Sequence, residues 1–187
     1  MPLTVSAPGG LPDFDKLYDD YFDFVCRNAR RLGVAPAAMD DVVQDVFVVA
    51  HRRLSDVENP KSLRAWMLSI VLRVVRNHQR TTRRKGFMQR ADGQLEPDQL
   101  PDGRSADQQT WVEQADTLLL LHGLLAELDD AKREVFVLAE LEEMTELEIA
   151  EALGENVNTV HSRLRAARKT FDQALQRYRA QDAWRLR

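Results

Sequence analysis

Two stretches of this chain carry the types of side chain that bind nucleic acid. Residues 61–90 contain nine Lys and Arg and no Asp or Glu, and residues 156–187 contain eight basic and two acidic residues. Guanidinium and ammonium groups bind phosphates, and short polar side chains hydrogen-bond to base edges. The net charge of the 187-residue chain is −4, but its basic blocks alternate with acidic ones, so each basic block can form a separate phosphate-binding surface. Two solvated helix faces are the simpler alternative.

The side chains capable of covalent or metal chemistry follow no pattern typical of an enzyme. The single Cys26 excludes an internal disulfide and a multi-cysteine zinc site. None of the four His residues has a carboxylate three residues before it, as the Glu-x-x-His pairs of di-iron bundles require. The chain also has no Gly-rich phosphate loop and no Ser or Cys nucleophile motif. We therefore expect a binding protein that is not an enzyme and uses no metal or cofactor.

The sequence contains no pattern typical of a membrane span or an export signal. No apolar run approaches the roughly 18 residues that a span requires. The first residues lack the basic start and apolar run of a signal peptide. We expect a cytoplasmic protein without a membrane anchor.

The first basic block lies on one face of a long predicted helix. Asn59 and Pro60 are typical of a helix start, as the N-cap and the first helical residue. The helical period separates a buried stripe from a basic one. The buried stripe contains Leu63, Trp66, Met67, Ile70 and Val74. The basic stripe contains Ser69, Arg73, Arg76, Asn77, Arg80 and Arg84.

An amphipathic helix is also predicted from Phe14 to Gly33, with Cys26 as a buried hydrophobe close to its apolar stripe. That stripe contains Phe14, Leu17, Tyr18, Tyr21, Val25, Ala29 and Leu32.

A further helix opens after Pro36 and carries an unusual outer face. Val48 lies there among Asp41, Gln44 and Asp45, which is typical of a protein-binding surface. A solvated face with one stray valine explains these residues nearly as well. The inner face contains Met39, Val42, Val43, Val46, Phe47, Ala50 and Leu54.

The composition divides the chain into two small all-α domains. Residues 86–113 are acidic, rich in Gly, Pro and Gln, and poor in apolar periodicity, which is typical of an extended linker. We expect a flexible tail over 1–13, one helical domain over 14–85, a second over 114–176, and a C-terminal tail over 177–187.

Two capped helices are predicted in the second domain. Asp129 caps a helix that places Val135, Leu138 and Leu141 inward. Thr145 begins the next helix through a capping box with Glu148, three residues later.

The end of the second domain has the spacing of a helix-turn-helix. Ala150 permits a close helix crossing, and Gly154 four residues later permits a tight turn. A last helix then buries Val160 and Leu164 and leaves polar and basic side chains outside. A helical hairpin with an exposed basic face is the alternative.

Two blocks together carry a family resemblance: MDDVVQDVFVVAHRRL with SLRAWMLSIVLRVVRNHQRTTRRK, and LLAELDDAKREVFVLAELEEMTELEIAEALGENVNTVHSRLRAARKTF. They resemble regions 2 and 4 of extracytoplasmic function (ECF) sigma factors, small bacterial transcription initiation factors. The resemblance spans roughly residues 14–85 and 115–175. It implies a region 2 helical bundle and a region 4 helix-turn-helix, and the partners core RNA polymerase, promoter DNA and an anti-sigma factor.

The resemblance implies a role for each exposed surface. The DD-x-x-QD-x-F motif docks on the clamp helices of the largest polymerase subunit, and the flap of the second subunit is a further contact. The implied core-polymerase-binding residues are Asp41, Gln44, Asp45, Phe47 and Val48. The implied minus-ten residues are Asp56, Asn59, Lys61, Arg73, Arg76, Asn77, Arg80, Arg83 and Arg84. The implied minus-thirty-five residues are Asn158, Thr159, His161, Ser162, Arg163, Arg165, Arg168 and Lys169.

The chain departs from the family pattern on both DNA-facing surfaces. Arg73 stands where many relatives have Asn, and Asn158 to His161 replace the common Gly-Thr-Val-Lys. A stand-alone helix-turn-helix regulator is the alternative function, but it leaves the basic stripe at 69–84 and the Val48 face unexplained. The alternating charge also predicts that the free chain binds duplex DNA poorly.

Overall fold

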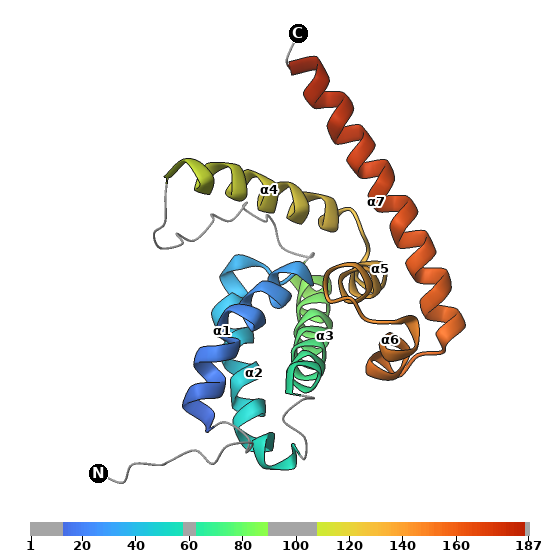
Figure 1. The fold of residues 1–187 in the computed structure, drawn as a ribbon. Helices are drawn as coiled ribbons and strands as arrows, with labels where there is room; N and C mark the ends of the chain where they lie inside the picture. Colours follow the sequence, from blue (N-terminus) through green and yellow to red (C-terminus); the bar gives the residue numbers. More distant parts are fainter. Residues whose placement is uncertain (1–12, 58–62, 90–107, 186–187) are drawn as a thin grey trace. The chain divides into compact units, whose positions relative to one another are not determined.

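The computed structural model describes residues 13–57, 63–89 and 108–185, and within these ranges the chain forms helices and no strand (Figure 1). The helices gather into two compact units, one holding α1 to α3 and the other α4 to α7. The all-α, two-domain prediction is confirmed.

The first unit contains α1 (Phe14–Arg31), α2 (Met39–Arg53) and α3 (Leu63–Gln89), with short 3-10 turns at Pro36–Ala38 and Leu54–Asp56. The side chain of Asp13 caps α1 by accepting a hydrogen bond from the Lys16 amide at 2.9 Å. Gly33 has a φ of 91°, which lets the chain turn out of α1 while the Val34 amide bonds to the Ala29 carbonyl. This stop agrees with the prediction.

The core of the first unit is built from the predicted apolar stripes and extends beyond them. Trp66 and Val74 are only half-buried, whereas Leu68, Val71, Leu72 and Val75 are buried. The sequence from 65 to 72 contains no charged residue, so α3 buries a wider arc there than a single stripe. The most buried side chains of this core include Leu17, Val25, Val42, Val46, Met67, Ile70 and Val71.

An aromatic cluster joins α1 to α2. Phe47 of α2 contacts Phe14 edge-on, with ring centroids 6.4 Å apart, and Tyr18 at 4.5 Å. The Phe22 ring lies nearly parallel to Phe47 at 6.4 Å. Aromatic pairs in these geometries add to the stability that burial alone provides.

The second unit contains α4 (Gln108–Ala126), α5 (Asp130–Phe136), α6 (Glu146–Leu153) and α7 (Val157–Arg185). Asp129 caps α5 as predicted, accepting from the Lys132 amide at 2.9 Å, and the Lys132 hydrogen bonds hold the Asp129 pKa below its usual value.

The end of α5 differs from the prediction. It continues as a π turn over Val137–Leu141, and Leu141 is half-exposed, whereas Val135 and Leu138 are fully buried. A π turn holds more residues per turn than an α-helix, so it rotates Leu141 away from the position that a 3.6-residue period assigns to it.

The helix-turn-helix is confirmed in its local geometry. Thr145 accepts from the Glu148 amide at 3.3 Å, and the Glu148 carboxylate accepts from the Thr145 amide at 2.8 Å, so both halves of the capping box are present. These bonds lower the Glu148 pKa. Gly154 has a φ of 65° in the turn, and Val160 of α7, which packs against α5 and α6, is fully buried.

Three helices run past the predicted segment boundaries. α3 continues to Gln89 and α4 begins at Gln108, inside the predicted linker, and α7 continues to Arg185, through most of the predicted tail. These helices extend beyond the apolar periodicity from which they were predicted. An existing helix propagates into polar sequence more easily than a new helix forms. The rest of the linker and the N-terminal tail up to residue 12 lie outside the described residues.

Replacing Phe47 tests whether it acts as core. We expect Phe47→Ala to lower the free energy of opening α2 by about 3 kcal/mol, because it removes a buried ring from a packed cluster. Val48→Ala, at the next position but 40% exposed, serves as the control, with an expected change within about 0.5 kcal/mol. Amide hydrogen exchange of α2 in the intact chain measures both. Equal effects of the two substitutions would contradict the assignment.

Candidate functional site

The outer face of α2 brings together four of the five residues predicted to bind polymerase. Asp41, Gln44, Asp45 and Val48 are all exposed, and their spacing places them along one side of the helix. Phe47 is separated from them, because only 4% of its surface is exposed. The exposed face therefore presents carboxylates around one apolar side chain, and Phe47 supports it from the core side.

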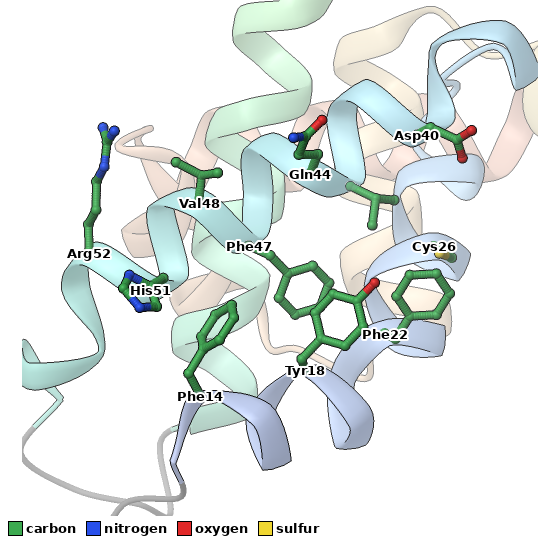
Figure 2. A pocket seen from close by; sticks show the side chains of 11 residues that line it. Phe14, Tyr18, Phe22, Cys26, Asp40, Gln44, Phe47, Val48, His51 and Arg52 are labelled. Carbon is green, nitrogen blue, oxygen red and sulfur yellow. The ribbon is translucent and has the colours of Figure 1, made fainter.

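An aromatic groove of about 520 Å³ lies next to this face, between α1 and α2 (Figure 2). Its α1 wall contains Phe14, Tyr18 and Phe22, and its α2 wall includes Val48 and Gln44, which also belong to the outer face of α2. The acidic and apolar face and the aromatic groove thus form one continuous surface.

This groove was not predicted, although its signal is present in the sequence. Phe14, Tyr18, Phe22 and Cys26 follow one another at intervals of four residues, which places them in one row along α1. Tyr18, expected in the core, is 40% exposed, and Cys26 is half-buried at the groove. Burial raises the pKa of the Cys26 thiol, which keeps it protonated and a poor nucleophile.

The basic face of α3 is exposed as predicted. Arg73, Asn77 and Arg80 lie in one row, and Arg83 follows them, while Arg76 is half-buried. The predicted minus-ten residues Asn59 and Lys61, and the side chain of Arg84, lie outside the described part of the structure.

Asp56 is exposed at the end of the 3-10 turn after α2. Its carboxylate accepts a hydrogen bond from Arg53 Nε at 3.3 Å. Both side chains are about half exposed, so the ion pair is weak and Asp56 can exchange Arg53 for another partner.

The outer face of α7 carries all eight residues predicted to read the minus-thirty-five element. Thr159 and Arg163 are half-buried and the other six are exposed. A shallow polar groove runs along this face beside His161, Arg165 and Lys169. The first turns of α7 thus offer short hydrogen-bonding groups, followed by cations, as an α-helix in a major groove requires.

Three of these α7 side chains pair with glutamates that precede α7. His161 Nδ1 lies 3.1 Å from both carboxylate oxygens of Glu146, and Arg163 Nη1 lies 3.0 Å from Glu155 Oε1. Arg168 Nη2 lies 2.7 Å from Glu140 Oε1. In the sequence these glutamates belong to an acidic block, and nothing there connects them with α7.

Neither a cluster of metal ligands nor a membrane-spanning helix is present in the described part of the chain. No group of three or more His, Cys, Asp and Glu side chains there is placed to hold a metal ion. None of the described helices combines the length and the apolar character that crossing a membrane requires.

Each of the two units matches a known protein family. The Sigma-70 region 2 family matches residues 17–85, and the Sigma-70, region 4 family matches residues 118–171.

Curated relatives match across most of the chain. The RNA polymerase sigma factor CnrH of Cupriavidus metallidurans is 33% identical over 168 residues, covering 87% of this chain and 86% of CnrH. The RNA polymerase sigma factor NccH of Alcaligenes xylosoxydans is 30% identical over 175 residues, covering 91% of each protein. The ferric citrate uptake sigma factor FecI of Escherichia coli is 27% identical and covers 79% of this chain and 82% of FecI.

Solved structures show the same architecture. CnrH in complex with the cytosolic domain of CnrY has a TM-score of 0.57 and 27% identity, covering 87% of each chain. The sigma factor RpoE of Bartonella quintana, in complex with the anti-sigma factor NepR, shares the fold with a TM-score of 0.66 at 19% identity, covering 88% of this chain and 97% of RpoE. With both regions matched and relatives aligned along nearly the whole length, the chain belongs to the ECF group of RNA polymerase sigma factors.

Proposed function

We propose that this sigma factor directs promoter-specific initiation by presenting three separate surfaces to core RNA polymerase and promoter DNA. The observation that carries the proposal is the separation of one acidic and apolar face, on α2, from two basic faces, on α3 and α7. The basic faces suit DNA, because phosphates attract them, and the acidic face suits a protein partner, because phosphates repel it. The chain acts by binding, and the polymerase performs the chemistry.

The outer face of α2 docks on the clamp helices of the largest polymerase subunit. Asp41 and Asp45 supply charge that sets orientation and association rate, and Val48 supplies apolar contact at the centre. The aromatic groove extends this surface with the exposed rings of Tyr18 and Phe22. Partly exposed aromatic side chains are enriched at protein interfaces, which supports this assignment.

The flap of the second polymerase subunit takes a different surface, on the second unit. Leu119 of α4 and Tyr178 of α7 border a groove of about 620 Å³, and Leu118 is also exposed on α4. These side chains lie away from the helix-turn-helix turn at Gly154, so protein and DNA can bind the unit together.

The two basic faces bind the promoter. Along α3, Arg73 and Arg80 contact the phosphates of the melted minus-ten element, and Asn77 between them hydrogen-bonds to nucleotides. On α7, Asn158 and Ser162 read base edges of the minus-thirty-five element in the major groove, with cations of later turns on the phosphates.

An anti-sigma factor is a further partner. CnrH, a relative with the same two regions, has been solved with the cytosolic domain of CnrY. We propose that this chain likewise binds a protein partner, and that this partner is an anti-sigma factor that competes with polymerase for the same surfaces.

The function is tested by transcription with sigma-free bacterial core polymerase on fragmented genomic DNA, followed by sequencing of the new RNA 5′ ends. We expect discrete starts that depend on the added chain and share two upstream elements. If folded protein and active core give no new starts, while the chain alone binds duplex DNA tightly and specifically, the stand-alone regulator replaces the proposal.

Asp45→Arg tests the polymerase surface. We expect affinity for core polymerase to fall by about tenfold or more, because the substitution reverses a charge inside the interface. Titration of labelled sigma factor with core measures the affinity, and circular dichroism checks the helix content. Asp19→Arg, an equal charge reversal at an exposed position of α1, is the control. Unchanged binding of a folded Asp45→Arg protein removes this face from the interface.

Arg80→Ala tests the basic face of α3. We expect the salt dependence of holoenzyme binding to promoter DNA to weaken by about 0.9 in the log–log slope, because one phosphate contact is lost. The same loss is expected for Arg73→Ala, which removes the other exposed arginine of this row. Arg27→Ala, which removes an exposed cation from α1, leaves the slope unchanged. A slope that stays the same in both α3 variants identifies a solvated face.

A further inference from the structure

The α7 surface contains its own counter-charges. Glu140 comes from the π turn, Glu146 from the first turn of α6, and Glu155 from the turn between α6 and α7. Each pairs with one cation or histidine of α7, at 2.7 to 3.1 Å. Three different elements thus each place a carboxylate against α7, although the proposed role of α7 is to bind DNA, which is itself negatively charged.

These pairs weaken the attraction of α7 for phosphates of any DNA sequence. An arginine that is bound to a carboxylate must exchange that partner for a phosphate, so it adds less to sequence-independent attraction than a free arginine does. Exposed ion pairs are worth only about 0–1 kcal/mol, so the exchange is possible once other contacts hold the helix in place. Base contacts supply that hold only at the correct sequence.

Other side chains of α7 remain available for the first contact. Arg165 and Lys169 are exposed and, within the ranges that the structure describes, neither is ion-paired. Asn158 and Ser162 are exposed in the first two turns. The paired and the available groups are therefore interleaved along one face.

We propose that Glu140, Glu146 and Glu155 are specificity-determining residues that act as internal counter-ions for α7. They withdraw Arg163, Arg168 and, when protonated, His161 from non-specific phosphate binding until base contacts form. This inference rests on the proposed function, because it requires α7 to face DNA. It explains how a unit with a basic helix avoids binding DNA of any sequence.

The chain offers a control that is matched in charge and includes another ion pair of α7. Glu127 pairs with Arg177 at 3.1 Å, also on α7 but far from the helix-turn-helix turn. Glu143 and Glu151 are exposed glutamates close in sequence to the proposed counter-ions. A triple substitution at these three control positions raises the net charge by the same amount as one at the proposed positions.

The experiment compares Glu140→Gln/Glu146→Gln/Glu155→Gln with Glu127→Gln/Glu143→Gln/Glu151→Gln in the full chain. Fluorescence anisotropy with a short random-sequence duplex is measured over a range of salt concentrations at neutral pH. We expect the first triple variant to bind the duplex about tenfold more tightly than the control at low salt. Its log–log salt slope should be steeper by about 2, since Arg163 and Arg168 each gain a phosphate worth about 0.9.

A double-mutant comparison isolates one pair. In the wild-type chain Arg168→Ala should leave the salt slope nearly unchanged, whereas in the Glu140→Gln chain it should reduce the slope by about 0.9. Equal effects of Arg168→Ala in the two backgrounds would show that Glu140 does not hold the arginine back. A first triple variant that binds no better than the control would overturn the proposal.

Arg165→Ala/Lys169→Ala separates the two possible failures. If this variant weakens duplex binding while the counter-ion variant matches its control, α7 faces DNA and only the present inference fails. If neither set of substitutions changes duplex binding, the assignment of α7 to DNA fails as well. A gain in random-duplex binding should also appear in transcription as additional starts that lack the shared upstream element.

Discussion

Burial of an apolar stripe on each helix is the constraint on which every functional surface depends. In α2, Val46 and Ala50 are completely buried, and the helical period then leaves Asp41, Asp45 and Val48 outside. No separate interaction is needed to expose this face. It is the geometric consequence of packing α2 against α1 and α3.

The same constraint acts on α7, with the turn at Gly154 as an added condition. Val160 and Leu164 are buried because α7 packs against α5 and α6, so Asn158, Ser162 and Arg165 face outward. Gly154 connects the two helices in a left-handed conformation, which few other residues adopt without strain. Capping of α6 by Thr145 fixes where that helix begins.

The charge of each exposed face then determines whether that face attracts or repels phosphates. The acidic and apolar face of α2 excludes phosphates, and the basic face of α3 attracts them. The α7 face is intermediate, since its cations are interleaved with carboxylates from the preceding helices. A protein that recognises a few sites in a genome benefits when its recognition helix binds other DNA sequences only weakly.

The helices, most of their inner faces, the capping box and the helix-turn-helix can be predicted from the sequence alone, because each depends on residues within one or two turns of one another. The aromatic groove, the π turn that moves Leu141 outward, and the side-chain pairs of α7 depend instead on how the helices pack. Those pairs join residues 8, 15 and 28 positions apart on different elements. Periodicity assigns a residue to a face of its own helix, but only the packing of one helix on another decides which side chains of two faces meet.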